Sequence, residues 1–103
     1  MSDLDELTRR VKAAVGADSG LGKSLKFDLK GDGIVLIDGG EVSNEDRPAD
    51  LTILTTIADL KALASGKLDP MSAVMTGKVK MSDMSLAMGL QGKLQALFSR
   101  LAA

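Results

Sequence analysis

The triplet Gly22-Lys23-Ser24 has the sequence found at the end of a phosphate-binding loop, so phosphate binding is the first function to consider for this chain. The full motif needs a glycine at the position that Ala17 occupies here. It also needs a preceding strand and a following helix, so that amides at the helix start hold the phosphate. The pattern around the triplet predicts the reverse order, and we interpret it as a loop.

A group of carboxylates in the middle of the chain is a second candidate, for calcium binding or for paired acid–base chemistry. Its spacing fits no EF-hand calcium loop. Asp28 falls on the polar side of an alternating strand, and Asp32 and Asp38 fall in glycine-containing turns, where Asp is common. The sequence therefore predicts a solvated acidic surface and no metal site, formed by Asp28, Asp32, Asp38, Glu41, Glu45, Asp46 and Asp50.

The 103 residues include no His and no Cys, which removes the usual zinc ligands, the imidazole base and the thiolate nucleophile. Without histidine no serine can be activated as in a triad, and nothing favours a Ser–Lys pair. The net charge is −1, and Phe27 and Phe98 are the only aromatic residues. No nucleic-acid partner is expected, because such proteins combine basic faces with aromatic platforms. We therefore expect no enzyme.

Methionine is concentrated near the C-terminal end, where five of the six methionines lie within residues 71–88. Met is flexible, fills irregular space and recurs on surfaces that accept varied apolar partners. Two apolar stripes at helical spacing follow: Met84, Met88, Gln91, Leu94 and Phe98, and Leu86, Leu90, Leu97 and Leu101. An ordinary surface helix needs one apolar arc. The pattern is consistent with a movable helix over an apolar cavity, but composition alone favours a doubly packed core helix or a homodimer interface.

The first half of the chain predicts one helix followed by strands. Apolar residues from Leu4 to Val15 recur at helical spacing, with Ser2 as the expected N-terminal cap. Residues 24–30 alternate, which predicts a strand with one buried face. The glycines of residues 31–33 suit a hairpin turn, and the return strand over 34–37 is apolar on both faces.

The second half alternates short strands with helices. Thr56 is the expected N-terminal cap of one helix, and Asp69 followed by Pro70 begins the next. The expected elements are a strand over residues 51–55, helices over 57–65 and 71–76, a strand over 78–81 and one final helix over 83–101. This order predicts a single α+β domain over residues 1–103, with a mainly antiparallel sheet and helices on one face.

Several short motifs, in this order, resemble the sterol carrier protein 2 family, and the resemblance covers residues 24–98. They are LKFDL and GDG of residues 25–33, ADLTI of 49–53, DL of 59–60, SGKLDP of 65–70, the Ala-x-x-x-Gly-Lys-x-Lys segment of 73–80, and DMSLAMGLQ of 83–91. Many relatives also place a Trp on the second strand, where this chain has only aliphatic residues.

The resemblance implies a twisted, mainly antiparallel five-stranded sheet with an additional short strand around residues 40–42. It also implies an apolar tunnel that takes acyl chains, acyl-CoA, phospholipids or sterols without a cofactor. Gln91, which interrupts an apolar stripe, is either a contact for a head group or carboxylate or a solvent-exposed side chain. The ligand-binding lining expected for this chain is Phe27, Ile34, Leu36, Ile53, Met75, Val79, Met81, Met84, Met88, Leu90, Gln91, Leu94 and Phe98.

The expected function is non-catalytic binding and transfer or presentation of lipids, with transient contact with a membrane surface, by a monomer or weak homodimer. The alternative is an accessory protein-interaction or dimerisation domain without a functional cavity. The longest uncharged stretch, residues 84–92, is too short for a bilayer span. The acidic N-terminus does not resemble a secretory signal, and the C-terminus is not a peroxisomal tail. The default expectation is a soluble, cytoplasmic protein.

Overall fold

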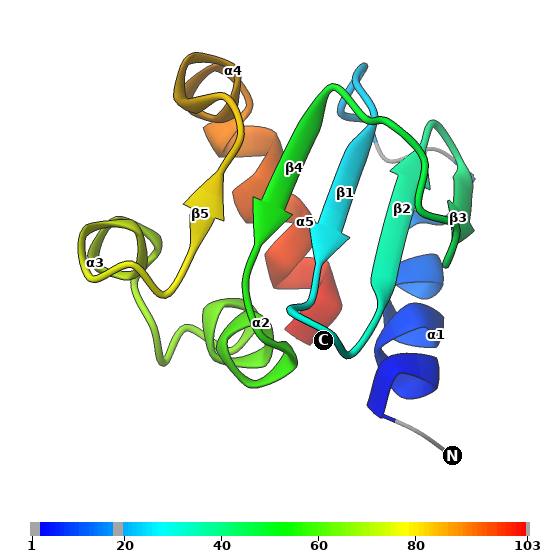
Figure 1. Ribbon diagram of the computed structural model, residues 1–103. Helices are drawn as coiled ribbons and strands as arrows, with labels where there is room; N and C mark the ends of the chain where they lie inside the picture. The colour runs from blue at the N-terminus through cyan, green and yellow to red at the C-terminus, as the bar shows by residue number, and fades with distance from the viewer. Residues whose placement is uncertain (1–2, 18–19, 103) are drawn as a thin grey trace.

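The computed structural model describes residues 3–17 and 20–102, which form five helices and five strands (Figure 1). The chain begins with helix α1 (Asp3–Val15), which buries Leu7, Val11 and Val15 at the spacing that the sequence shows. Gly16 follows with φ +63°, a left-handed conformation that glycine adopts easily at a helix end. The predicted helix is therefore confirmed, whereas Ser2, its expected cap, lies outside the described residues.

The strands are β1 (Leu25–Asp28), β2 (Ile34–Asp38), β3 (Glu41–Ser43), β4 (Leu51–Leu54) and β5 (Lys80–Met81), in the order β3-β2-β1-β4-β5. The α+β class and the five strands are confirmed, including a short strand near residues 40–42. Three of the pairings are antiparallel, but β1 and β4 run parallel, so the sheet is mixed. The parallel pair arises because the chain crosses the sheet after β3 and starts β4 beside the start of β1.

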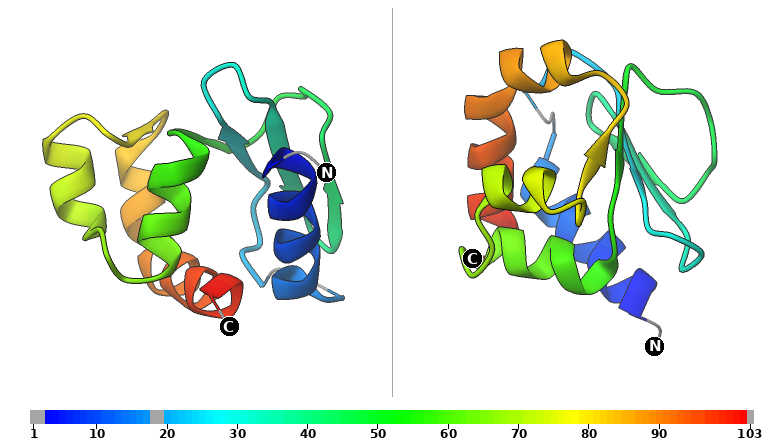
Figure 2. Two further views of the ribbon diagram at one scale, coloured as in Figure 1. Left: turned by 90° about the horizontal axis from the view of Figure 1, so that it is seen from below. Right: turned by 60° about the vertical axis from the view of Figure 1, so that its left-hand side comes forward.

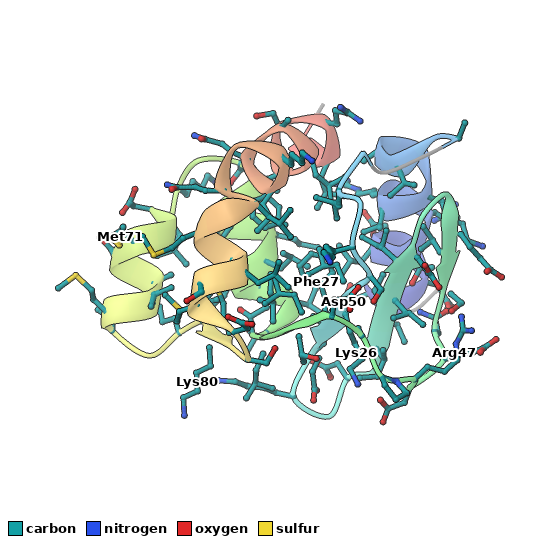
Figure 3. The ribbon with its side chains drawn as sticks, turned by 90° about the horizontal axis from the view of Figure 1, so that it is seen from above. Lys26, Phe27, Arg47, Asp50, Met71 and Lys80 are labelled. Carbon is teal, nitrogen blue, oxygen red and sulfur yellow. The ribbon has the colours of Figure 1, made fainter. Side chains whose placement is uncertain are left out.

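The helices lie on one side of the sheet or beyond its β5 edge, and the segment joining β3 to β4 runs on the other side (Figures 1 and 2). The core fills the space between sheet and helices. Phe27 lies in this interior (Figure 3), and its ring centroid is 6.3 Å from that of Phe98 on helix α5 (Gln91–Ala102). The contact joins the centre of the sheet to the C-terminal helix.

The register of β2 decides which of its apolar side chains face the core. Val35 pairs with Phe27, and Ile37 pairs with Leu25. Directly opposite residues on neighbouring strands point to the same face, so Val35 and Ile37 face the helices. The expectation that Ile34 and Leu36 share the face of Phe27 is wrong by one residue, because a strand that is apolar on both sides carries no signal for its register.

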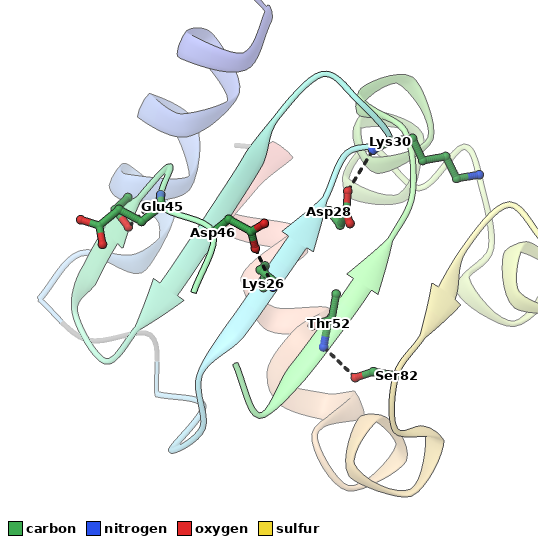
Figure 4. Close-up of polar contacts among 8 residues, drawn as sticks. Lys26, Asp28, Lys30, Glu45, Asp46, Thr52 and Ser82 are labelled. Atoms are coloured by element: carbon green, nitrogen blue, oxygen red, sulfur yellow. Dashed lines mark hydrogen bonds and ion pairs between the residues drawn. The ribbon is translucent and has the colours of Figure 1, made fainter. Parts of the chain in front are cut away.

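The outer face of the sheet is crossed by residues 44–50 on their way from β3 to β4. The Lys26 Nζ on β1 lies 2.9 Å from the Asp46 Oδ1 on this face (Figure 4). The Asn44 side-chain amide, at the start of the segment, donates instead to the Thr8 hydroxyl of α1 at 2.9 Å and to the Ile34 carbonyl at 2.8 Å. Leu36, which neighbours Lys26 across the β1–β2 pair, is only 2% exposed. The second apolar face of β2 is thus buried by the structure without lining the core.

Ser24 and Asp50 hold the starts of the parallel strands β1 and β4 together. The Ser24 amide and hydroxyl donate to the Asp50 Oδ2 at 3.0 and 3.1 Å, and the Asp50 amide donates to the Ser24 Oγ at 2.8 Å. The backbone hydrogen bond from Ser24 and then the one from its hydroxyl lower the pKa of Asp50 below the usual 3.8; desolvation opposes them, and the charge of Lys23 contributes least to the lowering. The ionised carboxylate is therefore favoured in the folded state.

Replacing Asp50 with Asn should lower stability at neutral pH and have less effect in acid. Because the folded pKa is the lower one, the charge contributes stability above pH 3.8 that is lost as pH falls through the folded pKa. Urea-unfolding midpoints from far-UV circular dichroism, measured at neutral pH and below pH 3.8, check this. Asp38→Asn, at an exposed carboxylate at the end of β2, is the control. A difference between Asp50→Asn and the parent protein that stays constant with pH would contradict the assignment.

Two short helices begin at the caps that the sequence predicts. The Thr56 hydroxyl accepts from the Asp59 amide at 3.1 Å at the start of α2 (Ile57–Ala64). The Asp69 carboxylate accepts from the Ser72 amide at 3.0 Å at the start of α3 (Pro70–Met75). The strand expected over residues 78–81 is shortened to β5, because the amides of residues 78 and 79 donate instead to the carbonyl of residue 73.

The single final helix expected over residues 83–101 is two helices, α4 (Met84–Gly89) and α5. The chain leaves helical geometry at Leu90 (φ −99°, ψ 3°), whose carbonyl accepts from the Leu94 amide at 2.8 Å to begin α5. Gly89 and Gly92 flank this point, and each favours a helix by about 1 kcal/mol less than Ala would. Within the described part of the chain, no helix has the length and apolar character needed to span a membrane.

Candidate ligand-binding site

An apolar hollow of about 190 Å³ lies at the β5 end of the sheet, where α3, α4 and α5 meet. The side chains that line it are Asp69, Met71, Val74, Met81, Met84, Ala87, Met88, Gln91, Leu94, Gln95 and Phe98. Eight of these eleven are apolar, so a molecule in the hollow would contact mainly hydrocarbon and thioether groups. Such a surface favours an apolar ligand because it offers few hydrogen-bonding partners.

The floor of the hollow continues the inner face of the sheet. The register pairs Phe27 with Ile53 and Ile53 with Met81, so the three side chains share one face. Met81 is the member of this row that reaches the hollow, while Phe27 and Ile53 are each 1% exposed in the core. Phe98 lines the hollow and also packs on Phe27. The hollow therefore lies directly against the core.

Three exposed methionines surround the hollow, and we call Met71, Met84 and Met88 the methionine rim. Their exposed fractions are 59%, 44% and 67%. Met71 comes from α3 (Figure 3), and the other two come from α4 one turn apart. Large apolar side chains gathered at one opening are typical of a site that receives an apolar partner.

Three of the side chains that line the hollow are polar, and they differ in their hydrogen bonding. Gln91 and Gln95 lie one turn apart on α5, are exposed, and offer amides that both donate and accept. Asp69 is engaged as the cap of α3. The two glutamines are thus the side chains of the lining most able to contact a polar group at the end of an apolar ligand.

The structure gathers six of the thirteen sequence-predicted lining residues around this hollow: Met81, Met84, Met88, Gln91, Leu94 and Phe98. Four others are buried in the core and do not line it: Phe27, Ile53, Val79 and Leu90. Ile34 and Leu36 face the other side of the sheet. Met75 is 81% exposed and lies outside the hollow. Whether any of these residues contacts a ligand remains a prediction.

The lining also includes five residues that sequence reasoning missed: Asp69, Met71, Val74, Ala87 and Gln95. Helical spacing is the signal that finds most of them. Met71 and Val74 lie three residues apart on α3, and Gln95 follows Gln91 by four. Met75 lies four residues after Met71 on α3, so helical spacing does not separate the two, yet of this pair only Met71 lines the hollow.

A second hollow, of about 510 Å³, lies between α1, the β1–β2 turn and α2. Its lining includes Asp3, Asp32 and Lys61, so it is charged where the first hollow is apolar. A long hydrocarbon chain would have to desolvate these groups without replacing their hydrogen bonds. The first hollow is therefore the better candidate for an apolar ligand, although it is the smaller one.

The remaining motifs of the sequence have structural roles. Gly22-Lys23-Ser24 precedes strand β1, as expected for a loop, and the amide and hydroxyl of Ser24 bond to Asp50. The carboxylates of the predicted acidic surface are exposed, except for the half-buried Asp28. Among residues 3–17 and 20–102, no group of three or more potential ligands is placed to hold a metal ion.

Several curated proteins named sterol carrier protein 2 match part of this chain. Sterol carrier protein 2 of Oryctolagus cuniculus is 46% identical over 54 residues, which cover 52% of this chain and only 10% of that protein. The match therefore spans about a tenth of the length of this relative.

Solved structures share the fold. The crystal structure of sterol carrier protein 2 like 2 from Aedes aegypti has a TM-score of 0.73 at 22% identity, covering 87% of this chain and 94% of that one. The solution structure of the sterol carrier protein domain 2 of Helicoverpa armigera has a TM-score of 0.59 at 26% identity, covering 95% and 75%. The model of the SCP-2 sterol transfer family matches residues 3–95. The chain belongs to the SCP-2 sterol transfer family.

Proposed function

We propose that this protein is a non-catalytic lipid carrier, which binds one acyl chain of a fatty acid, acyl-CoA or phospholipid in the hollow between β5, α3, α4 and α5. The observation that carries the proposal is the apolar hollow with its methionine rim. Membership of a family described by sterol transfer supports lipid as the ligand class. A sterol is the alternative ligand within the same proposal.

Binding of an acyl chain needs no covalent chemistry, because burial of its CH₂ groups supplies the free energy. Moving one CH₂ group from water to an apolar site contributes about 0.8 kcal/mol. A palmitoyl chain therefore offers roughly 10 kcal/mol before the costs of ordering, which take about half. The remainder corresponds to binding in the micromolar to millimolar range, so transfer between partners does not need a second reaction to release the lipid.

Binding a full acyl chain requires the hollow to widen. Its volume of about 190 Å³ is below the roughly 300–1,000 Å³ of ordinary small-molecule sites. Helices α3 and α4 are the elements best suited to move, since each is six residues long and, among the described side chains, they bury only Ala73 and Ala87 fully, while Val74 and Leu86 pack partly buried against the core. Helix α5 is fixed more firmly, through Leu97 and Leu101 among others.

The charges around the hollow favour an anionic head group and brief contact with an anionic membrane surface. Residues 67–93 contain four lysines and two aspartates, a net charge of +2, whereas the whole chain has −1. Lys78, Lys80 and Lys93 are exposed. Gln91 and Gln95 are placed to donate to a carboxylate or ester at the end of the chain.

Uptake of lipid by the purified protein tests the proposal. Native mass spectrometry after gentle extraction should show a fatty acid or phospholipid bound to a fraction of the molecules. Delipidated protein should then bind a fluorescent acyl probe with saturation at one probe per chain. Bare protein in the first measurement together with no saturable uptake in the second would overturn the proposal.

A docking or dimerisation domain is the second candidate, and Met75 favours it. This side chain is 81% exposed and lies outside the hollow, so lipid binding in the hollow does not explain why a large apolar side chain is exposed here. An interface that buries Met75 and Met71 against another protein chain would explain why both side chains are exposed in the single chain. Analytical ultracentrifugation over a range of concentrations should then show a dimer, and a monomer at all concentrations would contradict self-association.

A further inference from the structure

Methionine is the only side chain of this protein that hydrogen peroxide readily oxidises. The sequence contains no Cys, no Trp, no Tyr and no His, so no thiol or electron-rich ring competes for the oxidant. Methionine oxidation follows the exposure of the sulfur. Met71, Met84 and Met88 are about half exposed or more, and Met75 is the most exposed at 81%.

The position of these sulfurs relative to the hollow divides them into two groups. The methionine rim lines the hollow, whereas Met75 is equally available to an oxidant but lies outside it. Oxidation of the rim would therefore change the surface that an apolar ligand meets, and oxidation of Met75 would not. Treatment with peroxide thus modifies the methionine rim, where we expect an effect on ligand binding, and also Met75, which serves as an internal control.

We infer that the methionine rim is a reversible oxidation site that controls lipid binding. The inference rests on the proposed function. In the oxidation, a thioether sulfur gives an electron pair to one oxygen of hydrogen peroxide, the O–O bond breaks, an S–O bond forms, and the second oxygen leaves as water. In the reverse step, a methionine sulfoxide reductase returns the sulfur to the thioether while two thiols are oxidised to a disulfide and water is released.

The effect on binding follows from the polarity of the sulfoxide. Its oxygen is a hydrogen-bond acceptor that water satisfies while the hollow is open. When an acyl chain fills the hollow, the oxygen loses water and meets mainly apolar neighbours, among them Val74, Ala87 and Leu94. The oxidised rim therefore disfavours the bound state.

The fold itself should tolerate the oxidation. The rim side chains are largely in water already, while the core side chains of α3 and α4 include Ala73 and Ala87. Met81, which lies on the floor of the hollow and is half-buried, should react more slowly than the rim. The expected outcome of mild treatment is a folded protein with a polar rim and an intact floor.

The experiment treats delipidated protein with hydrogen peroxide, maps the added oxygen by peptide mass spectrometry and titrates a fluorescent acyl probe before and after. We expect the rim and Met75 to be oxidised before Met81, and the affinity to fall about tenfold or more. Methionine sulfoxide reductases of both stereospecificities, with dithiothreitol, should restore it. Circular dichroism of the treated protein should show that it stays folded.

Two variants locate the effect. Each is compared with itself before and after peroxide, whatever its starting affinity. The triple variant Met71→Leu, Met84→Leu, Met88→Leu should lose little affinity on treatment, whereas Met75→Leu should lose as much as the parent. Equal loss in the triple variant and the parent, or no loss in the parent despite complete oxidation of the rim, would overturn the inference. If the untreated parent takes up no probe, the proposed function itself fails, and the inference fails with it.

Discussion

Replacing Phe27 with Ala is expected to lower the free energy of unfolding by about 3–5 kcal/mol. Phe27 is 1% exposed, lies on the central strand β1 and packs against Phe98. Its removal takes away transfer free energy and leaves a cavity that the paired strands on both sides cannot fill by moving. Because a domain of this size is stable by about 5–15 kcal/mol in total, the variant should be close to the limit of folding at ambient temperature.

Urea denaturation followed by far-UV circular dichroism measures this effect, since the chain has no Trp or Tyr to report by fluorescence. Phe27→Leu is the matched control and should cost clearly less, because it keeps most of the side-chain volume. A loss below about 1 kcal/mol for Phe27→Ala, which is the size of an ordinary surface change, would contradict the central position given to this residue.

Replacing Met88 with Trp is expected to weaken acyl-probe binding about tenfold or more. Met88 lines the hollow and is 67% exposed, so a larger ring can be accommodated by the fold while it occupies space that the ligand needs. Excluding even two CH₂ groups from the site costs about 1.6 kcal/mol, which is more than a factor of ten in Kd.

Met75→Trp is the matched control, because Met75 is exposed on α3 but lies outside the hollow. It should bind the probe as the parent does. Each variant also introduces the only Trp in the chain, so its fluorescence reports ligand directly. The Trp at position 88 should respond to whatever probe still binds, and that at 75 should respond little. Equal probe affinities of Met88→Trp and Met75→Trp would contradict the assignment of the methionine rim to the ligand-binding site.

The sequence predicts most elements because local signals agree with their packing. Strict alternation over residues 25–29 places Leu25 and Phe27 in the core, and the structure buries both at 1% exposure. Thr56 and Asp69 cap the helices that follow them, because each side chain satisfies an amide at the helix start. These features depend on a few neighbouring residues, which is why one sequence is sufficient to find them.

The features that the sequence does not predict depend on distant contacts. Which side chains of β2 face the core is set by its pairing with β1. The parallel β1–β4 pair depends on a segment that crosses the outer face of the sheet, where Lys26 and Asp46 form an ion pair. The break at Leu90 lies inside a pattern that remains apolar on both sides of it. Similarly, Met71 and Met75 lie one turn apart on α3, and only the position of this helix beside the hollow places Met71, and not Met75, in the lining.

Photo-crosslinking tests the central claim, that an acyl chain lies between β5, α3, α4 and α5. A fatty acid with a diazirine near its methyl end is bound to the delipidated protein, irradiated and located by peptide mass spectrometry. Labels should fall on the hollow-lining residues of 71–98, such as Leu94 and Phe98, and an excess of unlabelled fatty acid should suppress them. Labels concentrated on the charged hollow around Asp32 and Lys61, or labels that competitor does not reduce, would contradict the claim.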